Sequence, residues 1–422
     1  MWSFDEAIAW LESHIDYERK PTIPYAALRP QTAFLMADLL GRPQDAFYAI
    51  HIAGTKGKGS VARFCEALLS KSAPAGGYFS PHITTILERI TVNCREVSEG
   101  DLAAALWEVR QIEPRLPTSP TYFEIMTAAA LLVHANAGVA YAAYEVGIGG
   151  RLDATRVVNP KVCVLTHIGY DHTDKLGTTL RQIAAEKAAI FRNHATAVIA
   201  PQSDEALQVA LETAKIANCT PLLFGRDFGF ENQNETFTIW FKSRRIEGIR
   251  LAMRGEHQKE NAAVAVAATL SLLGENALTD AQIKEALASA WLPARLELLK
   301  TEPPVLLDGA HNDSSLNVAL REAEKIFGDD FVVVFGCARD KEAKRMAQLL
   351  SQRDVVVCSY ANPRAFKAGE LAELLRGSGA RVMAAVENTA DALRHIRKPA
   401  LVCGSFYLVG EIRKLLQPKA LP

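Results

Sequence analysis

The sequence predicts an α/β protein of two domains, each with helices packed on a mainly parallel sheet. Apolar runs typical of buried strands alternate with helical segments along most of the chain. The section from about Phe237 to Met253 differs, because its apolar and polar residues alternate as in an antiparallel hairpin. A second strand–helix alternation starts near Val305, beyond an interruption at Pro293. We therefore expect an N-terminal domain over 1–292, with a small antiparallel hairpin sheet, and a smaller Rossmann-like domain over 293–422.

The individual elements follow from periodicity, caps and turns. Apolar runs predict strands of the first domain at 47–53, 139–146, 161–168 and 196–201. Helical periodicity, with a capping box from Ser98 to Asp101, predicts helices at 58–70, 98–109, 122–135, 180–191 and 259–273. Alternation predicts hairpin strands at 236–241 and 245–253. In the second domain we expect strands at 305–308, 331–336, 355–359, 381–386 and 400–404.

Composition argues against several classes of function. The 422 residues are 49% hydrophobic, and the net charge is −1. A chain so close to neutral has no overall attraction for nucleic acid or for an anionic membrane. No apolar stretch approaches the roughly 18 residues of a membrane span, and the acidic first segment lacks a signal-peptide pattern. The seven cysteines are scattered without a zinc spacing, which fits reduced thiols, so we expect a cytoplasmic protein.

The strongest candidate site is the stretch HIAGTKGKGS, residues 51–60, between a strand and a helix. It contains residues suited to hold a phosphate: Gly54, Gly57, Lys58, Gly59 and Ser60. Glycines let backbone N–H groups and the helix dipole converge on an anion, and a lysine can reach phosphate oxygens. The usual phosphate-loop formula requires glycine where Ile52 stands, so a plain strand–helix turn with solvated lysines stays open.

Acidic residues follow two further strands, where ligands bind in open parallel sheets. Glu145 ends a strand before a glycine-rich loop, and a carboxylate there suits Mg²⁺ or else faces solvent. Asp153, in the same loop, either receives a polar substrate group or caps a turn. Asp171, His172 and Asp174 lie close together after the next strand and suggest a metal or acid–base site.

Other polar residues are weaker candidates. Ser80 and His82 lie in the stretch YFSPHI. Asp308 and His311 lie at the end of a predicted strand, beside a glycine, and form a candidate polar site. Lys187 lies in a predicted helix, where an ordinary lysine is on the surface.

In this order, the motifs resemble the Mur ligase superfamily of ATP-dependent amide ligases. More narrowly, they resemble its bacterial folylpolyglutamate synthase and dihydrofolate synthase branch. The resemblance spans about residues 50–315, in the stretches HIAGTKGKGSVA, YFSPHI, TYFEIMTAAAL, YEVGIGGRLDAT, THIGYDHTDKLGTT, AAEKAAI, GEHQKENAAVA, ARLEL and LLDGAHN. It implies that ATP converts a substrate carboxylate to an acyl phosphate, which the amine of L-glutamate attacks. The implied partners are dihydropteroate, reduced folates and L-glutamate, with a monomeric state and no nucleic acid or membrane.

The resemblance also implies roles for single residues around the nucleotide. The phosphates of ATP would be held by Gly54, Thr55, Gly57, Lys58, Gly59 and Ser60. Asn261 would contact adenine, while Arg295 and Asp308 would touch the nucleotide from the second domain. His311 would lie near the transferred phosphate.

Two Mg²⁺ sites are implied as well. Ser80 and Glu145 would bind one ion, and Glu145 and His172 would contribute to the second. Lys187 would be carbamylated, since a neutral amine that captures CO₂ becomes an anion able to bind metal. With Lys58 and His311, the residues His172 and Lys187 make up the expected catalytic set.

A pterin pocket is the last implication. The pteroate substrate would lie near Thr121, Phe123, Asp153 and Ala154. Phe123 would stack on the pterin, and Asp153 would accept hydrogen bonds from its amino group.

The chain departs from the family pattern at three positions. Lys56 replaces an asparagine, Arg156 stands where the family often has asparagine, and Ala294 replaces a glycine. These changes leave the fine substrate preference open. The alternatives are a folylpolyglutamate synthase with one activity, another Mur-superfamily ligase such as one acting on a UDP-linked cell-wall precursor, or a nucleotide-binding protein without catalysis.

Overall fold

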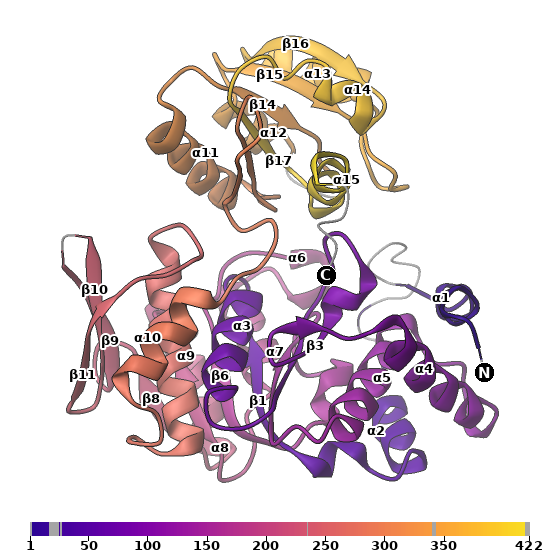
Figure 1. Cartoon of the computed structure of the whole chain (residues 1–422), viewed down its shortest axis with the longest axis vertical. Coiled ribbons are helices and arrows are strands. Elements are labelled where there is room, and N and C mark those ends of the chain that lie inside the picture. The colour runs from indigo at the N-terminus through magenta and orange to yellow at the C-terminus, as the bar shows by residue number, and fades with distance from the viewer. Residues whose placement is uncertain (1, 17–24, 26–27, 234, 340–342, 418–422) are drawn as a thin grey trace. The chain divides into compact units, whose positions relative to one another are not determined.

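The computed structural model describes residues 2–16, 25, 28–233, 235–339 and 343–417, which form two compact units (Figure 1). Unit 1 comprises Met1–His82, Leu87–Ala252 and Glu256–Trp291. Unit 2 comprises Leu292–Pro422 together with two short segments, Ile83–Ile86 and Met253–Gly255.

Unit 1 is built on an eight-stranded sheet with the order β4-β3-β2-β5-β1-β6-β7-β8. The strands are β1 (Tyr48–Ala53), β2 (Ala75–Tyr78), β3 (Ile90–Val92), β4 (Arg95–Glu96), β5 (Tyr141–Glu145), β6 (Pro160–Leu165), β7 (Thr196–Ile199) and β8 (Thr220–Leu223). Neighbouring strands from β2 to β8 are parallel, whereas β3 and β4 are antiparallel additions at one edge. Central parallel strands are covered on both faces, which explains why β1 is buried at every position after its first.

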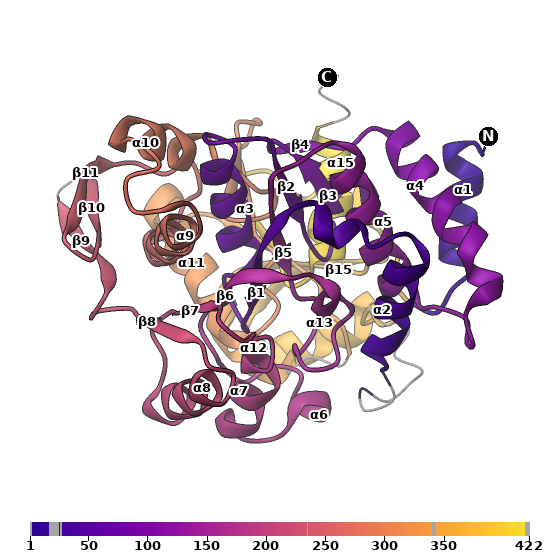
Figure 2. The same cartoon turned by 90° about the horizontal axis from the view of Figure 1, so that it is seen from below.

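Helices cover both faces of this sheet (Figures 1 and 2). On one face α3 packs against β1, β2 and β5, and beside it α9 packs against β6 and β7. On the other face α7 and α8 share a core with alternate residues of β6 and β7, because successive strand residues point to opposite faces. The helices of unit 1 are α1 (Phe4–Glu12), α2 (Pro30–Leu39), α3 (Lys58–Leu69), α4 (Glu99–Ile112), α5 (Tyr122–Asn136), α6 (Thr173–Leu176), α7 (Leu180–Ala188), α8 (Asp204–Ile216), α9 (His257–Leu273) and α10 (Asp280–Ser289), with short 3₁₀ turns at η2 (Pro43–Ala46), η3 (Ile86–Arg89), η4 (Glu113–Arg115) and η5 (Ala154–Val157).

A separate antiparallel sheet of three strands follows β8. Its order is β11-β10-β9, with β9 (Phe228–Gln233), β10 (Thr236–Phe241) and β11 (Arg244–Ile249). The predicted hairpin corresponds to β10 and β11, whereas β9 was missed. The reason is that β9 reads FGFENQ, and its apolar residues stop halfway along the strand.

Unit 2 contains a six-stranded sheet with the order β12-β13-β17-β14-β15-β16, parallel except for β12. Its strands are β12 (Glu297–Leu299), β13 (Val305–Leu307), β14 (Val332–Phe335), β15 (Asp354–Cys358), β16 (Arg381–Val386) and β17 (Ala400–Cys403). Its helices are α11 (Asp313–Phe327), α12 (Ala343–Leu349), α13 (Ala368–Gly377), α14 (Thr389–Leu393) and α15 (Phe406–Leu416).

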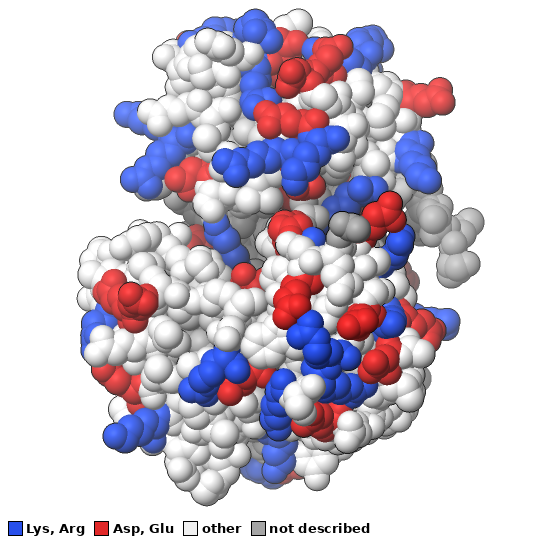
Figure 3. Space-filling view, turned by 90° about the vertical axis from the view of Figure 1, so that its left-hand side faces the viewer, with Lys and Arg blue, Asp and Glu red and all other residues white. Residues whose placement is uncertain are grey.

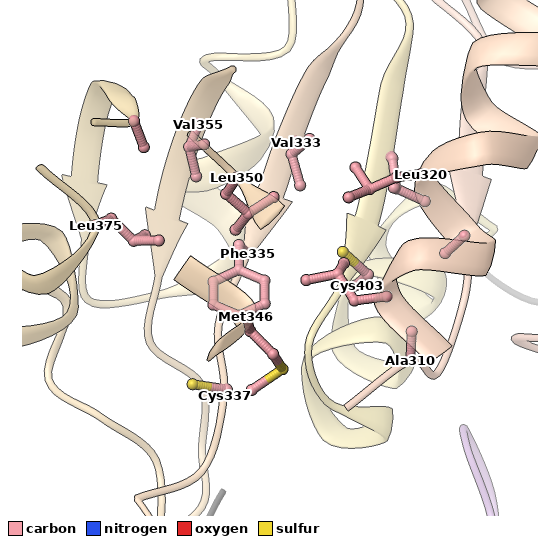
Figure 4. Close-up of a cluster of buried hydrophobic side chains, with 14 of the residues drawn as sticks. Ala310, Leu320, Val333, Phe335, Cys337, Met346, Leu350, Val355, Leu375 and Cys403 are labelled. Atoms are coloured by element: carbon pink, nitrogen blue, oxygen red, sulfur yellow. The ribbon is translucent and has the colours of Figure 1, made fainter. Parts of the chain in front are cut away.

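Both faces of the unit 2 sheet are buried. Figure 4 shows one face, where Leu320 of α11, Met346 of α12 and Leu375 of α13 share one hydrophobic cluster with Val333 and Phe335 of β14 and Val355 of β15. The other face packs against α14 and α15. Helices on both faces of a mainly parallel sheet make unit 2 Rossmann-like.

The predicted fold class is confirmed, including the small antiparallel sheet. Five further strands were missed. Strands β3, β4 and β12 are two or three residues long and pair antiparallel with their neighbours. Strands β2 and β8 are parallel and only four residues long, with the sequences AGGY and TPLL, whose glycines and proline are unusual in strands. At Ser98 one half of the predicted capping box is seen, since its side chain accepts from Asp101 N. That side chain also donates to the Asp101 carboxylate.

Two observations agree with what the composition predicts. On the face drawn in Figure 3, basic and acidic side chains are interspersed rather than gathered by sign. Within the described ranges, no helix combines the length and the apolar character needed to cross a membrane.

Candidate active site

The loop between β1 and α3 is shaped by two glycines with positive φ. Gly54 has a φ of 153° and Gly57 a φ of 87°. A Cβ atom on Gly54 would lie 1.8 Å from Thr166 Oγ1, and one on Gly57 would lie 2.4 Å from Asn261 Oδ1. A side chain would therefore clash at both positions. The loop leads directly into α3, whose first N–H groups are suited to bind an anion.

The segment after β6 holds this loop in place. Thr55 N donates to His167 O at 2.9 Å, and Thr55 Oγ1 exchanges hydrogen bonds of 3.1 Å with the backbone N–H and C=O of Gly169. Lys56 N donates to the same His167 carbonyl at 3.3 Å. Burial lowers the pKa of His167, and the charge of Lys56 lowers it further. The unusual Lys56 thus adds positive charge beside the loop that follows β6.

The predicted phosphate lysine and two predicted metal ligands form one cluster. Strands β2, β5 and β1 are neighbours in the sheet and end at the same edge. Lys58 Nζ lies 3.9 Å from Glu145 Oε1, and Ser80 N donates to Glu145 Oε2 at 3.2 Å. A Cβ on Gly59 would lie 3.2 Å from Glu145 Oε2, so the carboxylate lies against the first turn of α3. Ser60 is buried in that same turn.

Lys187 is not the surface residue that its helix predicts. It lies in the last turn of α7 and is only 4% exposed. Its Nζ donates to Gly54 O at 2.9 Å. Burial, followed by the charge of Lys58, lowers the pKa of Lys187 from 10.5 to about 7. The surface expectation was wrong because Ala184 and Ala188, also on α7, are small enough to let the helix pack closely on the sheet.

His172 lies between β6 and the short helix α6. Its backbone is in the left-handed region, with φ 49° and ψ 41°. Its N–H donates to Asp171 Oδ1 at 3.0 Å, and its Nε2 lies 3.8 Å from Asp171 Oδ2. A left-handed conformation is uncommon for a residue other than glycine and is concentrated at functional sites.

Thr121 and Phe123 open helix α5. Thr121 Oγ1 accepts from Glu124 N at 3.3 Å, and its own N–H donates to Glu124 Oε2 at 2.7 Å, so the two residues form a capping box. The Phe123 ring lies against the loop after β5, since a Cβ on Gly147 would be 2.7 Å from Phe123 Cζ. The Phe123 ring also approaches Tyr78, with ring centroids 5.9 Å apart.

Asp153 is buried and caps the 3₁₀ turn η5, which begins at the buried Ala154. Its Oδ1 accepts from Thr155 N and its Oδ2 from Ile148 N, both at 3.0 Å. Burial raises the pKa of Asp153, while these hydrogen bonds oppose the shift. Of the two interpretations left open by the sequence, turn capping is the one seen in the geometry, and contact with substrate stays a prediction.

Asn261 lies near the start of α9 and is buried beside the glycine loop. Its Oδ1 would be 2.4 Å from a Cβ on Gly57. Its Nδ2 donates to Gln258 Oε1 at 3.0 Å. The predicted adenine contact and the phosphate loop are therefore adjacent.

The predicted site residues of unit 2, Arg295, Asp308 and His311, lie near the end of β13. Asp308 Oδ2 accepts from Leu296 N and Oδ1 from Ala310 N, both at 2.9 Å. Burial raises the pKa of Asp308 to about 6, against the opposing charge of Arg295. The Arg295 guanidinium lies 4.8 Å from the centre of the Phe406 ring, and the His311 ring lies 5.4 Å from it.

Sequence reasoning missed Glu186, the neighbour of Lys187. Glu186 Oε2 accepts from Tyr25 OH at 3.1 Å, and Oε1 accepts from Arg151 Nε at 2.8 Å. A Cβ on Gly150 would lie 2.8 Å from Glu186 O. Glu186 therefore joins α7 to the loop after β5. No local sequence signal reports this, because its partners lie far away along the chain.

Two family models match the chain. Residues 52–269 match the Mur ligase middle domain, and residues 294–406 match the Mur ligase, glutamate ligase domain. The chain is 32% identical to the dihydrofolate synthase/folylpolyglutamate synthase of Bacillus subtilis over 446 residues, which cover 98% of this chain and 99% of that protein. It is 30% identical to the protein of the same name from Escherichia coli over 390 residues, covering 91% and 90% of the two chains.

Solved structures agree over nearly the whole length. A folylpolyglutamate synthase of Mycobacterium tuberculosis, complexed with ADP and AMPPCP, matches with a TM-score of 0.88 and 27% identity, covering 98% of this chain and 99% of that one. A bifunctional folylpolyglutamate synthase/dihydrofolate synthase of Yersinia pestis, complexed with AMPPNP and Mn ion, matches with a TM-score of 0.85 and 28% identity, covering 99% and 98%. E. coli FolC, in complex with DHPP and ADP, matches with a TM-score of 0.86 and 26% identity, covering 99% of each chain.

Proposed function

The chain belongs to the Mur ligase family, in the dihydrofolate synthase/folylpolyglutamate synthase branch, and on that premise we propose that it uses ATP to join L-glutamate to dihydropteroate and to reduced folates. One observation carries the proposal. At the carboxyl edge of the unit 1 sheet, Lys58 and Glu145 meet beside the first turn of α3, and the buried Lys187 amine contacts the glycine loop.

The first half-reaction depends on holding phosphates in place. The N–H groups at the start of α3 and the Lys58 ammonium bind the phosphate oxygens and offset their charge. A carboxylate oxygen of the folate substrate then attacks the terminal phosphorus, the bond from phosphorus to ADP breaks, and an acyl phosphate forms. The chain contributes by positioning and by charge, since the loop glycines hold a geometry closed to other residues.

In the second half-reaction the amine of L-glutamate attacks the acyl carbon. The carbon–oxygen bond to phosphate breaks, phosphate leaves with the electron pair, and the amine loses a proton as the amide forms. His311, beside Asp308 in unit 2, is proposed to lie near the transferred phosphate. Its Nδ1 lies 2.8 Å from Gly309 O, which fixes the orientation of the ring.

The donor set fits divalent metal ions of the Mg²⁺ type. Among the described residues no group of three or more His, Cys, Asp or Glu side chains could hold a metal ion. Mg²⁺ needs no such group, because it commonly binds through one or two protein oxygens together with phosphate oxygens and water. Ser80 and Glu145 would hold one ion, with Glu145 and His172 contributing to a second. When bound, the ions supply further neutralisation of phosphate charge.

We propose that Lys187 carries a carbamate. Its pKa of about 7 leaves a large fraction of the amine neutral near pH 7, and only a neutral amine can attack CO₂. Nitrogen bonds to the CO₂ carbon and one proton is released. ¹³C-labelled bicarbonate should give a carbamate signal by NMR in the wild type and none in Lys187→Ala, and an identical spectrum from both proteins would refute the modification.

The remaining predicted residues are proposed to bind substrate. The pterin pocket would be formed by Thr121, Phe123, Asp153 and Ala154. Asn261, Arg295 and Asp308 would contact the nucleotide. We assign ATP binding to residues 1–292 and the glutamate ligase role to residues 293–422. We also propose a monomer that works in the cytoplasm without nucleic acid.

Phosphate release tests the function directly. The full chain with ATP and Mg²⁺ should release phosphate with dihydropteroate plus L-glutamate, and again with tetrahydrofolate plus L-glutamate. Activity with only the second pair would make the protein a folylpolyglutamate synthase with one activity. Tight nucleotide binding without turnover on either pair would sink the proposal and favour a ligase for a different substrate or a non-catalytic protein.

A further inference from the structure

Three buried polar side chains, His51, Thr155 and Asp153, are linked by hydrogen bonds from β1 to the loop after β5. His51 and Thr155 are 0% exposed, and Asp153 is 2% exposed. His51 Nε2 lies 2.8 Å from Thr155 Oγ1, which in turn lies 2.5 Å from Asp153 Oδ1. In the sequence only Asp153 stands out, because histidine in a strand and threonine in a turn are ordinary.

Counting the available protons shows which group donates in each hydrogen bond between His51, Thr155 and Asp153. The Thr155 hydroxyl has one proton, and an ionised Asp153 can only accept, so Thr155 donates to Asp153. His51 must then donate from Nε2 to Thr155, which leaves its Nδ1 without a proton. That nitrogen makes no hydrogen bond in the described part of the chain. Burial and the nearby charges of Arg192 and Arg156 lower the pKa of His51, so the ring is neutral, as this order of donation requires.

These hydrogen bonds connect β1, which leads into the nucleotide loop, to the loop after β5. That second loop packs against Phe123, the residue predicted to stack on the pterin. His51 lies on β1, whose end leads into the glycine loop. At the other end, Asp153 Oδ2 accepts from Ile148 N at 3.0 Å. Ile148 follows Gly147, against which the Phe123 ring packs. The orientation of Asp153 therefore sets the position of this loop.

We propose that Thr155 and His51 are positioning residues for the pterin-bearing substrate, acting through Asp153. The proposal rests on the proposed function, because it needs a substrate that occupies the pocket of Phe123 and Asp153. Neither positioning residue touches the substrate. Thr155 holds the Asp153 carboxylate in one rotamer, and His51 holds the Thr155 hydroxyl pointing at that carboxylate.

Thr155→Val tests the hydrogen bond to Asp153 because it replaces the Thr155 hydroxyl by a methyl group of similar size. In the full-length enzyme, KM for dihydropteroate and for tetrahydrofolate should each rise about tenfold, the scale of a lost hydrogen bond to a charged group. KM for ATP should stay within about twofold, since the glycine loop is unchanged. Thr155→Ser keeps the hydroxyl and should restore KM for dihydropteroate to within about threefold of wild type.

A matched control is Thr238→Val, the same change at a buried threonine of β10 whose hydroxyl makes no hydrogen bond within the described ranges. It should leave every KM unchanged. His51→Phe should raise KM for dihydropteroate less than Thr155→Val does, because Thr155 can still donate to Asp153.

Three outcomes would overturn the proposal. They are an unchanged KM for both pterin substrates, a parallel rise of KM for ATP, or no recovery in Thr155→Ser. If Thr155→Val does not fold, His51→Phe against His51→Gln gives the same comparison, with higher KM for dihydropteroate expected in the variant that cannot donate. A wild-type enzyme without turnover would overturn the proposed function and this inference together, whereas normal wild-type turnover with unaffected variants would overturn the inference alone.

Discussion

Glu66 on α3 and Lys187 on α7 are both buried charged side chains of unit 1, and their surroundings differ. Glu66 is 0% exposed and accepts from Arg63 Nη1 at 2.6 Å and from Thr91 Oγ1 at 2.7 Å. It also accepts a backbone N–H at 2.9 Å. Lys187 is 4% exposed and makes one hydrogen bond, to a loop carbonyl, with no ion-pair partner in the described part of the chain.

The difference separates a structural charge from a functional one. Burying a charge is costly unless opposite charge and hydrogen bonds offset the lost hydration. Around Glu66 burial raises the pKa, while Arg63 and the hydrogen bonds oppose that shift. Around Lys187 burial and the charge of Lys58 outweigh the opposing charges of Asp171, Asp153 and Glu186, and the pKa falls to about 7. A buried lysine beside a phosphate loop whose charge is only partly offset is neutral in a large fraction of molecules, and a reactive amine must be neutral.

The largest expected effect follows from removing the Lys187 amine. Lys187→Ala should lower kcat by about 10³-fold, the upper range for losing one electrostatic contact to a developing charge. The measurement is phosphate release at saturating substrates. Lys215→Ala, which removes an exposed helix lysine from α8, is the matched control and should keep full activity. If Lys187→Ala retains a tenth of wild-type kcat, the functional half of the comparison is wrong.

The compensated charge should respond in the opposite way. Glu66→Gln should lower the free energy of unfolding by about 3 kcal/mol, because it leaves Arg63 buried without its counter-charge. The folded fraction should keep a kcat close to wild type. Urea unfolding gives the first quantity and titrated active enzyme the second. Arg63→Met combined with Glu66→Leu should be less destabilised than Glu66→Gln, and a larger loss in the double variant would contradict this account of the pair.

Local features of the sequence predicted several residues that the structure brings together in the candidate site. Gly54 and Gly57 stand between an apolar run and a helix, and both have the positive φ that glycine adopts readily. Glu145 could be placed because carboxyl ends of neighbouring parallel strands meet at one edge. Both inferences depend only on a strand, recognised from a short apolar run, and on the residues that follow it, and these can be read from a few neighbouring positions in the sequence.

The burial of Lys187 could not be read in the same way. Whether a lysine in AAEKAA lies on the surface depends on which face of α7 meets the sheet, and that is set by tertiary packing. The partners of Glu186 and of Glu66 are equally remote from local pattern. Strand β9 was missed for a different reason, since its polar half gains strand structure only by pairing with β10.

The pH dependence of stability sharpens the contrast further. Between pH 7 and the ordinary lysine pKa of 10.5, the unfolded chain binds more protons at this site than the folded one. The contribution of Lys187 to the free energy of unfolding should therefore rise with pH, by about 2 kcal/mol from pH 7 to 8.5. Lys187→Met lacks the titrating group, so wild type minus Lys187→Met isolates the effect in urea unfolding. A difference that is flat with pH would mean that the buried amine keeps its ordinary pKa.

The smallest expected effect concerns the helix that carries Lys187. Thr179 opens α7 with a capping box, in which Gln182 N donates to Thr179 Oγ1 at 3.2 Å and Gln182 Oε1 accepts from Thr179 N, also at 3.2 Å. Thr179→Ala should lower the free energy of unfolding by about 1 kcal/mol. It should leave kcat unchanged, because Lys187 is held at the far end of α7 by the Gly54 carbonyl. Thr279→Ala removes the same kind of box from α10 and is the matched control, with a similar stability loss and no change in kcat. A kcat that falls in Thr179→Ala and not in Thr279→Ala would show that the cap, and not burial alone, positions the Lys187 amine.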